Sequence, residues 1–225
     1  MTLRLAARPI PRLLTIASLV VLIGCASGGG RRPVNVPGAA GAATPGAVTN
    51  SVQGLYESGR YREVINNVNA GDGSAQALWF AAQSSLRLGQ REEAASQFMQ
   101  LPQVGGDPAW QTVADLALAL LRDNPEEIDR AREAAAAFPA DPFVQYELGL
   151  AHLRRNDLTA AAQAFDRCTQ AAPRFAYAYY SSGLAYNRLN RSDLAIARLE
   201  MFEQLAPAAP ERPEVTSILQ TVRGR

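Results

Sequence analysis

The second half of the chain repeats itself with a period of 34 residues, and this repeat limits the possible folds more than any other feature. A shift of 34 positions aligns identical residues: Tyr146 with Tyr180, Gly149 with Gly183, Arg154 with Arg188, and Ala161 with Ala195. The same shift relates Pro139, Pro173 and Pro207. An earlier unit at 75–104 fits with a shift of 67, matching Leu86 with Leu153 and Phe98 with Phe165. Units of this length pack against their neighbours, so a linear array is predicted.

Three helix starts are marked by a capping side chain followed by proline. Asp107-Pro108, Asn124-Pro125 and Asp141-Pro142 lie 17 residues apart, which is half a repeat. An Asp or Asn at the N-cap with proline at the first helical position favours helix initiation. The pattern predicts five helix pairs: 48–59 with 61–70, 75–88 with 91–101, 108–122 with 125–137, 142–155 with 158–171, and 176–189 with 192–205. A last helix is predicted at about 213–222, and no segment is predicted to be a strand.

This repeat resembles the tetratricopeptide (TPR) family. Gly149 and Gly183 supply the small residue where the two helices of a unit cross, and Ala161 and Ala195 face them from the second helix. Phe165 and Leu199 fill the interface. The resemblance implies an all-α fold, a TPR α-solenoid of about five helix pairs over 48–207 with a C-terminal capping helix in 208–225. It also implies energetics that are nearly one-dimensional, and a Gly183 position that tolerates Ala but not Leu.

The N-terminal segment is predicted to be a lipoprotein signal. Arg4, Arg8 and Arg12 precede an apolar run that ends at Leu22-Ile23-Gly24-Cys25, which resembles the bacterial lipobox. The resemblance implies a signal peptide at 1–24, lipidation of Cys25, and a Gly/Ala-rich flexible tether at 25–47. The protein would then be lipid-anchored to a bacterial membrane. Because Ala26 rather than Asp follows the cysteine, the outer membrane facing the periplasm is expected.

Composition argues against several classes of function. All 22 basic residues are Arg, and the folded region carries a net formal charge of about −4, so no nucleic-acid partner is predicted. His152 is the only histidine, which excludes a Ser-His-Asp triad or a multi-histidine metal site and favours a packing role. Cys168 is predicted to be a buried small hydrophobe. We therefore predict no catalytic residues, no metal, no cofactor and no small-molecule substrate.

Partner binding is the remaining class. In this family the first helices of the units line a concave groove that receives a protein or peptide ligand. Three of these helices carry an aromatic residue and, two turns on, an arginine: Trp79 and Arg87, Tyr146 and Arg154, Tyr180 and Arg188. These six residues are predicted to bind the partner. In the alternative interpretation the aromatic residues stack between repeats and the arginines interact with helix ends.

The predicted function is a non-enzymatic adaptor that assists assembly of an envelope complex. TPR lipoproteins of this size are similar to pilotin-type proteins and to the accessory lipoprotein of the β-barrel assembly machine. An alternative is a scaffold that recruits or regulates peptidoglycan hydrolases or synthases. A gene neighbourhood containing a secretin, or instead a cell-wall hydrolase, would separate the two.

Overall fold

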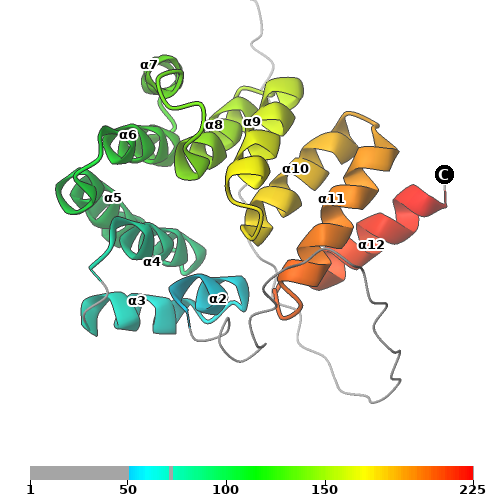
Figure 1. Ribbon diagram of the computed structural model, residues 1–225, viewed down its shortest axis with the longest axis horizontal. Coiled ribbons are helices and arrows are strands. Elements are labelled where there is room, and N and C mark those ends of the chain that lie inside the picture. The colour runs from blue at the N-terminus through cyan, green and yellow to red at the C-terminus, as the bar shows by residue number, and fades with distance from the viewer. Residues whose placement is uncertain (1–50, 71–72, 225) are drawn as a thin grey trace, which may run out of the picture. The chain divides into compact units, whose positions relative to one another are not determined.

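The computed structural model describes residues 51–70 and 73–224, which form eleven helices and no strand. Ten of them make five antiparallel pairs, in each of which we call the first the A helix and the second the B helix (Figure 1). The pairs are α2 (Val52–Glu57) with α3 (Tyr61–Ala70), α4 (Ala75–Arg87) with α5 (Arg91–Gly105), α6 (Pro108–Arg122) with α7 (Pro125–Ala135), α8 (Pro142–Arg154) with α9 (Leu158–Ala171), and α10 (Ala176–Arg188) with α11 (Ser192–Leu205). The last helix is α12 (Arg212–Arg223). The predicted signal peptide, Cys25 and the tether lie outside the described residues.

The capping residues begin their helices as predicted. Asp107 Oδ1 accepts a hydrogen bond from the Ala109 amide at 2.8 Å, and Asp141 Oδ1 accepts one from Val144 at 2.8 Å. Asn124 caps α7 in the same way. Each cap satisfies an amide that has no carbonyl partner in the first helical turn. The local sequence therefore fixes the three helix starts in the middle of the array.

Three helices, α2, α5 and α7, end two or more residues from the predicted position, and α7 ends at Ala135 rather than at 137. Helix α2 ends at Glu57 rather than at 59, because Gly59 takes a left-handed conformation with φ of 74°. Helix α5 continues past the predicted end at 101 and runs through Pro102 to Gly105. A proline there removes one amide donor from the last turns, and the helix ends only at Gly106, which has φ of 67°.

The helix crossings lie where the repeat predicted them. A Cβ atom built on Gly149 would lie 2.4 Å from Cε1 of Phe165, and one built on Gly183 would lie 2.7 Å from Cδ2 of Leu199. Ala161 and Ala195 are fully buried in the same interfaces. A methyl group at Gly183 would require the end of the Leu199 side chain to shift and would lie 3.3 Å from the Leu199 backbone nitrogen, so the tolerance of Gly183 for Ala stays a prediction.

The first helix pair also contacts the last pair of the array. In a solenoid whose units contact only their neighbours, these two pairs would not meet. The Gln53 amide donates to the Arg174 carbonyl at 3.0 Å, and the Ala176 amide donates to Glu57 Oε1 at 3.3 Å. The rings of Tyr56 on α2 and Tyr177 on α10 lie 5.0 Å apart. The expectation of nearly one-dimensional energetics is therefore wrong for the ends of the array.

None of the helices in the described residues is long and apolar enough to cross a membrane. Over the same residues, no group of three or more His, Cys, Asp or Glu side chains is placed to hold a metal ion.

Candidate functional site

The aromatic residues predicted to face a partner pack against one another instead. Trp79 is 1% exposed and Tyr146 is 5% exposed. Their ring centroids lie 5.6 Å apart, and both rings contact Phe175, at 5.6 and 4.9 Å. Rings from α2, α4, α8 and α10 thus form one cluster, made of Tyr56, Trp79, Phe80, Phe143, Tyr146, Phe175 and Tyr177. The expectation that Trp79 and Tyr146 are open to a partner is wrong, because the A helices use them to pack between repeats.

Two of the three predicted arginines, Arg154 and Arg188, bind neighbouring parts of the array. Arg154 Nη1 lies 3.5 Å from Asp123 Oδ1, at the end of the preceding A helix. Arg188 Nη2 donates to Asn156 Oδ1 at 2.8 Å, again one repeat earlier. Arg154 and Arg188 remain exposed and Tyr180 is half-buried, so a partner role for these three stays a prediction.

Arg87 is bound differently, because it reaches across the array. Its Nη1 lies 2.7 Å from Glu211 Oε1, just before α12, and its guanidinium stands 5.1 Å from the Tyr177 ring centroid. The Tyr177 hydroxyl donates to Glu211 Oε2 at 2.7 Å, and the Tyr180 hydroxyl donates to Glu214 at 3.2 Å. Arg87 and Tyr180 therefore fasten the capping helix to α4 and α10.

A buried carboxylate that the sequence analysis missed lies beside Trp79. Glu147 is 1% exposed, and its Oε1 accepts hydrogen bonds from Trp79 Nε1 at 2.9 Å and Gln83 Nε2 at 2.7 Å. Burial raises the pKa of Glu147 to about 7, although both hydrogen bonds lower it. Burial likewise raises the pKa of Glu57 to about 7. The repeat held a signal for Glu147, because the matching positions in the other units are Phe80 and Ser181, both buried.

We expect Glu147 to make stability depend on pH. The folded pKa of about 7 lies above the usual value of 4.5, so the folded protein binds more protons than the unfolded one between these values. The stabilisation is complete below about pH 4.5 and is lost as the pH rises through 7. Glu147→Gln keeps the acceptor oxygen, so it should reduce the loss of unfolding free energy between pH 5 and pH 8 by up to about 3 kcal/mol.

Urea denaturation of both proteins at each pH measures this difference. Contributions from Glu57 and from His152, whose pKa is lowered chiefly by burial, are common to both proteins and cancel. Parallel pH curves for the two proteins would contradict a raised pKa of Glu147.

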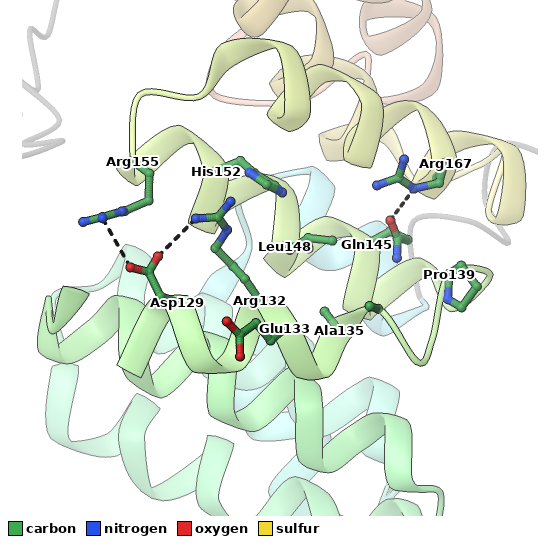
Figure 2. A pocket seen from close by; sticks show the side chains of 11 residues that line it. Asp129, Arg132, Glu133, Ala135, Pro139, Gln145, Leu148, His152, Arg155 and Arg167 are labelled. Carbon is green, nitrogen blue, oxygen red and sulfur yellow. Dashed lines mark hydrogen bonds and ion pairs between the residues drawn. The ribbon is translucent and has the colours of Figure 1, made fainter. Parts of the chain in front are cut away.

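A pocket of about 620 Å³ lies between α7, α8 and α9 (Figure 2). It forms because α7 packs mainly on α6 and only lightly on α8. Asp129 of α7 pairs with Arg132 at 3.1 Å and with Arg155, the residue directly after α8, at 3.3 Å. Opposite, Arg167 of α9 donates from Nε to Gln145 Oε1 at 2.6 Å. Of the pocket residues, the sequence analysis singled out only Pro139, as a repeat proline, and His152, as a packing residue.

Cys168 and His152 are both largely buried, but in different surroundings. Cys168 is buried, and burial raises the pKa of its thiol, which agrees with a packing role. His152 is largely buried with a side chain 13% exposed, but it lines the pocket instead of filling the core. Its Nδ1 faces the Asp157 carboxylate, 3.4 Å from Oδ2.

The comparisons with known proteins place the fold. The chain is similar to a chain of the Cut9–Hcn1 hetero-tetramer of the APC/C, with a TM-score of 0.51 and 18% identity over 76% of this chain and 41% of that one. It thus spans less than half the length of that protein. A second similar structure is a MamA RS-1 double mutant, with a TM-score of 0.41 and 18% identity over 71% of this chain and 93% of that one. A third is YrrB, described as a TPR protein with an unusual peptide-binding site. Its TM-score is 0.40, with 16% identity over 78% of this chain and 90% of that one.

No protein-family model and no curated protein matches the sequence. The helix pairs, the glycine crossings and the structural similarity together define the fold as a TPR α-solenoid of five helix pairs with a C-terminal capping helix, over the residues that the structure describes.

Proposed function

We propose that the protein is a non-enzymatic adaptor that holds a protein partner and is tied to a bacterial membrane by a lipid on Cys25. The observation that carries the adaptor role is the stack of helix pairs itself. Stacked pairs present long, continuous helix surfaces, and repeat proteins of this kind use such surfaces for binding. The fold alone does not select a ligand, so the partner has to be argued from particular sites.

The anchor and the location rest on the N-terminal sequence. Leu22-Ile23-Gly24-Cys25 follows an Arg-flanked apolar run, and Ala26 follows the cysteine. We propose attachment to the outer membrane, facing the periplasm, with the Gly/Ala-rich segment as the tether. There the adaptor would assist assembly of an envelope complex, in the manner of a pilotin-type protein or an outer-membrane assembly accessory.

Replacing Cys25 by Ala is expected to remove the anchor. The wild-type chain should fractionate with membranes and incorporate labelled fatty acid, whereas Cys25→Ala should lose the lipid label and partition away from detergent. Cys168→Ala is the matched control, because that thiol is buried in the solenoid and should leave labelling unchanged. Lipid labelling of Cys25→Ala equal to wild type would contradict the proposal.

The adaptor role is tested by cross-linking in intact envelopes, purification of the chain and mass spectrometry, followed by the reciprocal capture from the partner. A secretin or an outer-membrane assembly subunit recovered in both directions supports the proposal. A peptidoglycan hydrolase or synthase recovered in both directions overturns it in favour of the alternative scaffold. Absence of any reciprocally captured protein contradicts both.

A further inference from the structure

The pocket between α7, α8 and α9 has a basic lining in a domain whose net charge is negative. Arg132, Arg155 and Arg167 face two carboxylates, those of Asp129 and Glu133. Asp129 is shared by Arg132 and Arg155. Among the described residues no carboxylate lies within ion-pair distance of Arg167, which binds only the neutral amide of Gln145. The pocket therefore offers positive charge that its own acidic residues do not neutralise.

One buried donor of the lining, Arg132 Nε, has no hydrogen-bond partner within the described residues. His152 Nδ1 instead faces the Asp157 carboxylate, 3.4 Å from Oδ2. Figure 2 shows Arg132 reaching from α7 toward His152 on α8. A buried donor without a partner is costly, so such an atom in a pocket indicates a ligand that accepts hydrogen bonds. A carboxylate meets this need and gains charge-assisted hydrogen bonds from the arginines.

The shape of the pocket limits how a ligand enters. At about 620 Å³ it lies within the size range of sites that enclose a small ligand or a few residues. The loop at Pro139 joins α7 to α8 at one end, and the Asp129–Arg155 ion pair connects the same helices at the other. Leu148, Ala135 and Ala136 add an apolar lining. An acidic side chain flanked by apolar residues fits these three features.

We propose that this pocket is a docking site for an acidic peptide segment of a protein partner, whose carboxylate binds between Arg132, His152 and Arg167. The proposal rests on the adaptor function and names a surface for it. The site differs from the groove predicted by the family resemblance, whose residues Trp79 and Tyr146 are buried. Its ligand is defined by charge complementarity and by the unpaired donor Arg132 Nε, and the pocket supplies both.

His152 allows a direct test, because it is the only histidine in the chain. The intact chain is purified without a histidine tag in a neutral detergent, and the imidazole resonances are followed by NMR. The probe is the N-acetylated, C-amidated tripeptide Leu-Glu-Leu, with Leu-Gln-Leu as its neutral match. We expect Leu-Glu-Leu to shift the His152 resonances saturably and to raise the pKa of His152, and Leu-Gln-Leu to do neither. Equal responses to both peptides would overturn the proposal.

Two variants identify the site of binding. Arg167→Gln removes a pocket charge and should weaken Leu-Glu-Leu at least tenfold. Arg130→Gln is the matched control, since Arg130 lies on α7 outside the pocket and binds only the Glu126 carbonyl. Wild-type affinity in Arg167→Gln contradicts the proposal. A circular dichroism melt of each variant confirms that both are folded.

Further arms separate sources of the negative charge. Acetyl-Leu-Gln-Leu with a free C-terminal carboxylate should bind at least tenfold more weakly than Leu-Glu-Leu. Tighter binding of this peptide would mean that the pocket recognises a C-terminal carboxylate rather than an acidic side chain. If acetate or inorganic phosphate shifts the His152 resonances as much as Leu-Glu-Leu does at equal concentration, the pocket is a site for free anions, and the docking role is overturned. In envelopes, a partner captured equally by wild type and Arg167→Gln refutes the pocket and leaves the adaptor function intact.

Discussion

Trp79→Ala is expected to lower the free energy of unfolding by about 4 kcal/mol. The indole is 1% exposed and contacts the rings of Phe80, Phe143, Tyr146 and Phe175 at centroid distances between 5.0 and 5.6 Å. Its Nε1 also donates to the buried Glu147 carboxylate. Truncation therefore leaves a large cavity and removes a donor from a buried acid. Urea denaturation followed by circular dichroism measures the effect.

Two further variants separate the causes. Trp79→Phe keeps a ring but loses the donor, so it should fall between wild type and Trp79→Ala. Met99→Ala, on α5, is the control for truncating a large apolar side chain, because Met99 is 53% exposed and should change stability by less than about 0.5 kcal/mol. The burial of Trp79 argues against a role in binding a partner. A folded Trp79→Ala variant with wild-type stability and weakened capture of a partner would contradict this conclusion.

Leucine at Gly149 or Gly183 is expected to destabilise the solenoid by about 3 kcal/mol or more. At Gly149 the three atoms nearest to an added Cβ all belong to the Phe165 ring, at 2.4 to 2.7 Å. At Gly183 two of them belong to the end of the Leu199 side chain. Because a phenyl ring yields less easily than an aliphatic chain end, Gly149→Ala should cost more than Gly183→Ala.

Thermal melts of the four variants give this ranking. Gly73→Leu is the control, since nothing lies within 4 Å of a Cβ at that position. It should melt like wild type. A Gly183→Leu variant that also melts like wild type would mean that α10 and α11 do not cross at Gly183.

The parts of the fold that were predictable depend on residues close in the sequence. Each N-cap side chain accepts a hydrogen bond from an amide two or three residues later in the chain, as at Asp107, Asn124 and Asp141. Each helix start therefore follows from four or five consecutive residues. The glycine crossings were predictable for a related reason, since a small residue recurs at the same place in two units. The packing of aromatic rings at the expected groove was not predictable, because Tyr56 and Tyr177 are far apart in the sequence and meet only in the folded array.

The pocket shows the same limit. Its charged residues come from three helices, and in the sequence they are ordinary surface residues. What opens the space is the light packing of α7 on α8, where α7 presents the short side chains of Ala135 and Ala136. The sequence holds these alanines, but the angle at which α7 leaves the stack is set by its packing on α6. Glu147 is the exception, because aligning the repeats places its carboxylate among buried positions.

The contacts between α2 and the far end of the array bear on how the chain acquires its structure during synthesis. Glu57 of α2 receives its amide partner from Ala176, 119 residues later, and Arg87 of α4 receives Glu211, 124 residues later. The first two of the described helix pairs therefore wait for much later segments before their packing is complete. Separations of this size slow folding, because the intervening chain must be ordered before the contact forms. A chain interrupted before α12 leaves its earliest helices, as well as its latest, without their final neighbours.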